Sequence, residues 1–123
     1  MITKDKMIPM LLQAAPSFTE IWESNKEGFE DLPYMHLDEF GRHIVQLKIN
    51  NSMEEFPKIF ETIEHLHLDG DDYVKEAATI GILEAIQNHA LDRKLDPKIF
   101  ERYLLPASKE NWDKLIQFWE GKK

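Results

Sequence analysis

Three side chains that are able to bind metal ions lie at helical spacing in the first half of the sequence. His36, Glu39 and His43 are three and four residues apart, so a helix places all three on one face. Two imidazoles and a carboxylate in this arrangement suit zinc or a similar ion. A solvated helix face carries the same residue types, however, and the His-Glu-x-x-His pattern of zinc proteases is missing. A metal-binding enzyme or sensor on this face, with Glu64 or His67 contributing, is one hypothesis for function.

A second row of polar side chains lies on the segment from Gly70 to Arg93, which contains no proline. At about 100° per residue, its small and branched residues fall on one broad arc that lets neighbouring helices approach closely. These residues are Val74, Ala77, Ala78, Gly81, Ile82, Ala85 and Ile86. Glu76, Glu84 and Gln87 lie opposite this arc, interleaved with further apolar residues such as Leu83. The segment is apolar on nearly all sides, so we expect a central helix whose polar row forms a wet seam or borders a small-ligand groove.

Patterns typical of other catalytic sites are missing from the sequence. There is no cysteine, and the five glycines form neither a phosphate-binding loop nor a dinucleotide fingerprint. The aspartates around Gly70 do not fit a calcium-binding loop, because no glutamate closes the twelve-residue frame. No serine has a histidine partner that the sequence indicates, so we expect no catalytic triad; the serines are Ser17, Ser24, Ser52 and Ser108. These absences favour a non-enzymatic protein without a cofactor.

The elements that must position these residues are predicted to be helices only. Residues that start and stop helices divide the chain at short intervals, and runs of alternating polarity are missing. We predict an all-α fold in which residues 1–123 form one domain of six or seven helices. These helices are expected to form a HEAT-like, antiparallel stack around a central helix near 71–93. The predicted helices cover roughly 3–14, 17–28, 33–50, 57–70, 71–93 and 97–105, followed by a last one from about 108. The motif Pro-Lys-Ile-Phe-Glu at 57–61 recurs at 97–101, close to the period of HEAT-like repeats, although local capping requirements also produce such a match.

Several helix starts carry capping residues. Ser17 with Glu20 has the spacing of a capping box. Asp71 or Asp72 is expected to cap the central helix, and Asp96 is expected to cap the short helix that follows it.

Composition restricts the class of partner. The chain of 123 residues has a formal net charge of −8, which argues against binding to a nucleic-acid backbone. The start of the chain does not fit a signal peptide, because Asp5 and Pro9 interrupt the required pattern, and no apolar run is long enough to span a membrane. We therefore expect a cytoplasmic protein that binds neither nucleic acid nor membrane.

The densest acidic stretch lies around the second predicted helix. It contains five carboxylates, with Lys26 as the one basic residue among them. We call this group the acidic segment, and its members are Glu20, Glu23, Glu27, Glu30 and Asp31. A concentration of negative charge can steer a basic protein toward its surface.

Three longer stretches resemble a family of small, acidic, all-helical bacterial proteins of unknown function that is loosely associated with toxin-immunity proteins. The stretches are EFGRHIV at 39–45, EFPKIFETIEHLHLDGDDYVKEAATIGILEAIQNHAL at 55–91 and NWDKLIQFWEG at 111–121. The resemblance implies a helical superhelix and draws attention to the polar residues inside the matching blocks. These candidate binding residues are Glu39, Arg42, His43, Glu76, Glu84, Gln87 and Asn88. Our leading hypothesis is an immunity-like protein that binds a basic protein partner.

Overall fold

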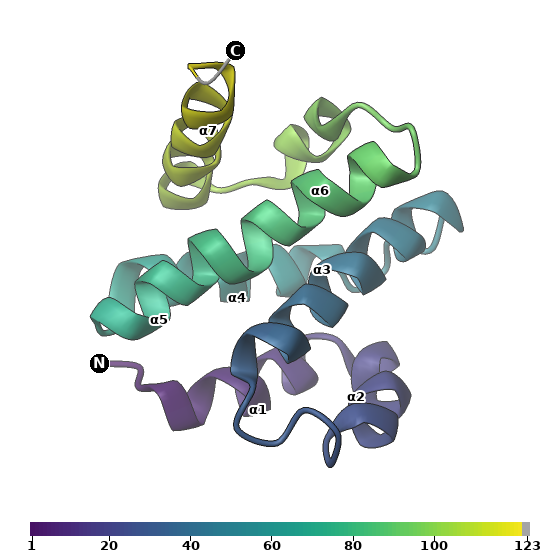
Figure 1. Ribbon diagram of the computed structural model, residues 1–123, viewed down its shortest axis with the longest axis vertical. Coiled ribbons are helices and arrows are strands. Elements are labelled where there is room, and N and C mark those ends of the chain that lie inside the picture. The colour runs from purple at the N-terminus through teal and green to yellow at the C-terminus, as the bar shows by residue number, and fades with distance from the viewer. Residues whose placement is uncertain (122–123) are drawn as a thin grey trace.

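A computed structural model describes residues 1–121, and it is all-helical as predicted. Seven α-helices are joined by short connections and by three segments of other helical types (Figure 1). The α-helices are α1 (Lys4–Ala14), α2 (Thr19–Asn25), α3 (Pro33–Ile49), α4 (Phe56–Asp69), α5 (Asp72–Glu76), α6 (Glu84–Asp92) and α7 (Pro106–Glu120). The 3₁₀ segments η1 and η3 cover Pro16–Phe18 and Pro97–Tyr103, and η2 (Ala77–Leu83) is a π-helix. No helix within residues 1–121 has the length and apolar content that crossing a membrane requires.

The central helix is confirmed. Elements α5, η2 and α6 form one continuous helix over residues 72–92, which packs against α1, α3, α4, η3 and α7. It crosses the middle of the molecule in Figure 1, with α4 behind it and α3 beside it. Every member of the predicted small-residue arc is buried. Burial of a large apolar side chain stabilises the fold by roughly 1.5–3 kcal/mol. This helix contributes Ile82, Leu83 and Ile86 to the core, although the largest fully buried side chains lie on other elements.

The middle of the central helix departs from α-helical geometry. Over Ala77–Leu83 the backbone is a π-helix, in which hydrogen bonds join residues five apart. The wider turn changes which side chains share a face, and Leu83, expected on the polar side, is fully buried. A regular helical wheel therefore misplaces this residue.

Two glycines allow α3 to pack closely on the central helix. An added Cβ at Gly41 would lie 2.5 Å from the Cβ of Ala85 and 3.2 Å from backbone atoms of Ala85 and Ile86. At Gly81, on the other helix, it would lie 2.6 Å from Cδ1 of Leu37. The small residues in the predicted arc therefore set the distance between these two helices.

The helix ends confirm some of the capping predictions and contradict one. Asp71 accepts a hydrogen bond from the Val74 amide at 2.9 Å, and Asp96 accepts one from the Lys98 amide at 2.9 Å. The capping box at Ser17 is wrong, because α2 starts only at Thr19 and the Ser17 side chain bonds elsewhere.

The two copies of the Pro-Lys-Ile-Phe-Glu motif fold differently. The copy at 57–61 lies in the first turns of α4, whereas the copy at 97–101 is 3₁₀-helical within η3. What the copies share is a proline at the start of a helical segment and a buried phenylalanine, Phe60 or Phe100. Local capping and burial also produce both of these shared features.

Candidate functional site

A pocket of about 530 Å³ opens where the N-termini of three helical elements meet. Its walls come from the start of α1, the connection at 29–33, the first turn of α3 and Asp71, the N-cap of the central helix. Pro33 fixes the start of α3 because its ring presets the first helical residue and it has no amide hydrogen to satisfy. We call this cavity the first pocket.

His36 forms part of the wall of the first pocket. The residue is only 8% exposed; its ring packs edge-on against Phe29 at a centroid distance of 5.4 Å and lies tilted against Trp22 at 6.2 Å. Burial lowers the pKa of His36 below its ordinary value, against an opposing effect of Glu39, so the imidazole is neutral at pH 7. Its Nδ1 atom is buried without a hydrogen-bond partner, which costs about 1–3 kcal/mol.

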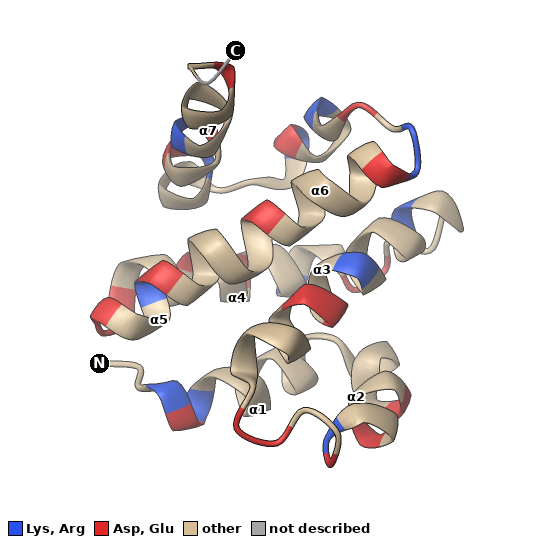
Figure 2. Cartoon of the chain, viewed as in Figure 1, with Lys and Arg blue, Asp and Glu red and all other residues tan. Residues whose placement is uncertain are grey.

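The charged side chains around the first pocket are mainly acidic. Asp5, Glu30, Asp31 and Asp71 supply four carboxylates, and Lys4 supplies one ammonium group, a formal difference of −3. Figure 2 shows that Asp and Glu residues continue along α2 and the connection before α3. The acidic segment and the pocket therefore form one negatively charged region.

A second pocket, of about 280 Å³, brings together three of the predicted binding residues. Glu39, Arg42 and His43 line it together with Ile21 and Gln46. Arg42 lies 4.0 Å from Glu39; the arginine is exposed and the glutamate half-buried, and such a pair at the surface contributes little stability. The second pocket therefore carries one residue of each charge and is less polarised than the first.

Beside the second pocket, Ser17 lies between a histidine and a glutamate. The Ser17 Oγ is 2.8 Å from Nε2 of His43 and donates to Oε1 of Glu55 at 2.5 Å, while the Ser17 amide donates to Oε2 of the same carboxylate at 3.1 Å. Burial lowers the pKa of His43, with Glu55 opposing.

The sequence indicated no histidine partner for any serine, whereas the structure places Ser17 beside His43; the geometry is nevertheless not that of a catalytic triad. In a triad the carboxylate orients the histidine, whereas Glu55 bonds to the serine itself. The proton of the hydroxyl points to Glu55, and the oxygen accepts from the neutral imidazole. The cluster fastens η1 to the N-cap of α4.

A similar cluster is buried where α4 meets α7. Glu64 accepts hydrogen bonds from the amides of Ala107 and Ser108 at 2.9 and 2.8 Å and from the Ser108 hydroxyl at 2.9 Å. The Nδ1 atom of His67 lies 3.1 Å from Ser108 Oγ, and its Nε2 atom lies 3.0 Å from Oγ1 of Thr79 in the π-helix. Ser108 is 1% exposed, so its hydroxyl is not accessible to a substrate.

The buried cluster caps a helix from a distance. The N-cap of α7, Leu105, has no side chain that caps, and Glu64 takes that role from another helix. Burial opposes its ionisation, but hydrogen bonds from Ala107 and Ser108 hold the pKa of Glu64 below its ordinary value. Burial likewise lowers the pKa of His67, although the Ile63 carbonyl and Glu64 oppose this.

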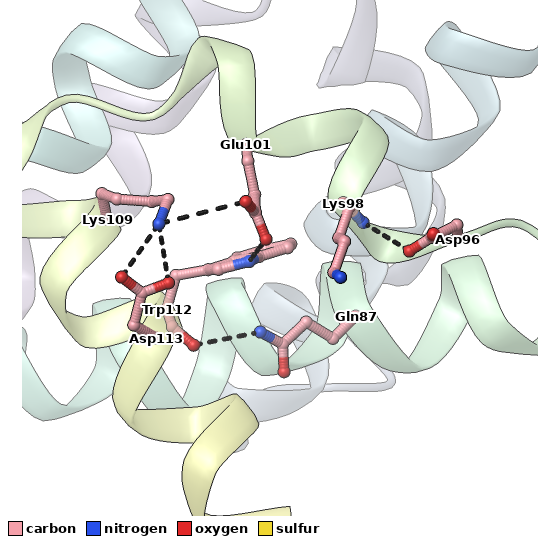
Figure 3. A network of polar contacts seen from close by, with 7 residues as sticks. All are labelled: Gln87, Asp96, Lys98, Glu101, Lys109, Trp112 and Asp113. Carbon is pink, nitrogen blue, oxygen red and sulfur yellow. Dashed lines mark hydrogen bonds and ion pairs between the residues drawn. The ribbon is translucent and has the colours of Figure 1, made fainter.

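The four candidate residues on the central helix lie outside the two pockets. Glu76 and Asn88 are exposed, Glu84 is half-buried, and none of the four lines either pocket. Gln87 is 4% exposed, and its amide donates to the Trp112 carbonyl at 3.4 Å. Figure 3 shows Gln87 in a contact network with the Trp112 indole, which donates to Glu101. Gln87 therefore joins the central helix to α7.

The structure also separates the residues of the metal hypothesis. His36 lines the first pocket, whereas Glu39 and His43 line the second. Among the 121 residues described, no three histidine, aspartate or glutamate side chains are placed to hold a metal ion. The three-and-four spacing predicted a shared helix face for His36, Glu39 and His43, but side chains on one helix face can contact different parts of the fold.

Comparisons with known proteins gave a match to one family. Residues 8–120 match the family described as a domain of unknown function (DUF7674). Comparison with curated proteins gave no match. Comparison with solved structures also gave none.

Proposed function

We propose that this chain, which belongs to the DUF7674 family, is a non-enzymatic module that binds a basic protein. The observation that carries the proposal is the continuity between the acidic segment and the first pocket. Glu30 and Asp31 belong to both, so a charged surface leads directly into a cavity. A partner attracted by the surface charge would meet a concave feature into which a side chain fits.

The charge supports association more than it determines affinity. A net charge of −8 with a local concentration of carboxylates raises the rate of encounter with a basic partner. At 0.1 M ionic strength, salt largely screens this attraction between exposed charges that are more than about 10 Å apart. We therefore expect the association rate to fall steeply with ionic strength and the dissociation rate to change less.

A narrower form of the proposal follows from the sequence resemblance. A small bacterial immunity-like protein would neutralise a basic toxin by covering its active site with the acidic segment. The pocket would then receive a side chain from the covered surface.

Affinity capture with two matched variants tests the proposed function. One bait carries Glu→Gln at Glu20, Glu23, Glu27 and Glu30. The other carries the same change at four exposed glutamates elsewhere, which are Glu54, Glu61, Glu110 and Glu120. Both lose four charges, so a basic partner should be retained by the wild type and the second bait and lost by the first. Equal retention by both variants, or retention that is indifferent to salt, would refute the proposal.

A further inference from the structure

We propose that the first pocket receives an arginine side chain, and that this arginine belongs to the basic partner. The identity of the partner rests on the proposed function above. The preference for a guanidinium group rests on the charges, rings and hydrogen-bonding groups of the pocket itself.

The charge of the pocket favours a cation even after the helix dipoles are included. The N-termini of α1, α3 and the central helix each contribute roughly +0.5 of a charge there. Together these come to about +1.5, which offsets only half of the formal difference of −3 between the carboxylates and Lys4. The pocket therefore keeps a net negative field.

The rings of the pocket favour a planar cation. Phe29 and His36 both line it, and their rings meet edge to face at an interplanar angle of 71°. A guanidinium group stacks on aromatic faces and still presents its edge to a carboxylate, whereas an ammonium group acts as a point charge.

The carboxylates at the rim point to a ligand with several donors. Glu30 and Asp31 are adjacent in the chain, and both line the pocket. The imidazole of His36 is neutral and does not repel a cation, and its Nδ1 atom is buried and not open to the pocket. Arginine has five N–H donors in a fixed fork, enough to bond to both rim carboxylates.

Titration with small probes measures the pocket without the partner. Acetyl-arginine amide, acetyl-lysine amide and acetyl-citrulline amide are added to the full chain, and chemical shifts are followed by NMR. We expect arginine to bind in the millimolar range and at least about fivefold more tightly than lysine, with shifts concentrated at Phe29 and His36. Citrulline, which has the same shape without the charge, should not bind. Equal binding of arginine and lysine, or shifts spread over the surface, would overturn the proposal.

Two double variants distinguish binding in the pocket from attraction by the overall negative charge of the protein. Glu30→Gln with Asp31→Asn removes two charges at the pocket, and Glu23→Gln with Glu27→Gln removes two beside it. Asp31 has a φ of 63°, a conformation that asparagine also tolerates, so the first variant should fold. We expect the first variant to weaken arginine binding at least about fivefold and the second less than about twofold. Equal losses would show that only the overall field attracts the probe and would overturn the proposal.

The same variants distinguish this inference from the proposed function. If arginine amide binds in the pocket but no basic protein is captured, the proposed function fails and the pocket assignment stands. If a basic protein is captured equally well by both double variants, the arginine assignment fails and the proposed function stands.

Discussion

Replacement of Glu64 by glutamine should destabilise the fold strongly although the two side chains have nearly the same shape. The carboxylate accepts three hydrogen bonds at the start of α7. Glutamine has one acceptor oxygen, and its amide nitrogen would face the N–H of Ala107 or Ser108, leaving a buried donor without a partner. A hydrogen bond to a charged group contributes about 1.5–3 kcal/mol, and loss of a helix cap costs about 0.5–2 kcal/mol. Because the variant no longer buries a charge, we expect a net loss of about 2–4 kcal/mol.

Glu61→Gln is the matched control for this variant. Glu61 lies one turn earlier on α4 and is exposed, and its one ion pair among residues 1–121 is with Lys58 at 3.5 Å. Such a surface pair contributes about 0–1 kcal/mol. Urea unfolding at pH 7, followed by circular dichroism and by fluorescence, measures both variants. Equal destabilisation of the two would refute the argument that Glu64 caps α7.

Acid provides a second measurement of the same carboxylate. The folded-state pKa of Glu64 is lowered, so below pH 4.5 the unfolded state takes up the proton first. Its contribution to stability is therefore present above about pH 4.5 and is lost as the pH falls through the folded-state pKa. The wild type should lose more stability than Glu64→Gln in this range. Parallel pH profiles would contradict the assignment.

Three further predictions test the packing, the histidines and the exposed serine cluster. Gly41→Ala should cost about 1–3 kcal/mol, because its Cβ would meet the backbone of the central helix. Gly81→Ala should cost less, because the nearest atom to its Cβ is the movable end of Leu37. Thermal or urea unfolding measures both variants, and the reverse order would contradict the packing described. NMR titration should place the midpoints of His36, His43 and His67 below the ordinary value of about 6.5, and higher midpoints would refute this. Because the folded state favours the neutral imidazoles, their contribution to stability is present above that pH. It is lost as the pH falls through the folded-state pKa values. Ser17→Ala should cost about 1 kcal/mol in urea unfolding, because it leaves Glu55 without its hydroxyl donor. Ser24→Ala, which loses a bond to the Glu20 carbonyl, should stay within about 0.5 kcal/mol. Equal effects would argue against the conclusion that Ser17 and Glu55 join η1 to α4.

Local rules predicted the elements well because the forces that set them act within a few residues. Pro33 starts α3, Asp71 caps the central helix, and the buried arc on that helix follows from side-chain spacing alone. The π-helix was not predicted, since its bonds depend on packing and on contacts such as that between Thr79 and His67.

The sites were harder to predict because the residues that meet in them are distant in sequence. Ser17 and Glu55 are 38 residues apart, and Glu64 and Ser108 are 44 apart. No spacing rule relates such pairs. His36 was singled out from its neighbours on the helix face, but the structure gives it a different setting, formed with Phe29 and Trp22.

Glu55 and Glu64, at the N-cap and in the middle of α4, bond to parts of the chain on opposite sides of this helix in sequence. Glu55 bonds to a residue that precedes it, and Glu64 bonds to residues that follow it. A fragment without the first seventeen residues would leave one carboxylate without its serine, and a fragment that ends before Ala107 would leave the other buried and unsatisfied. The segment around Ser17 and the start of α7 are therefore both tied to α4, and deletion of either should destabilise α4.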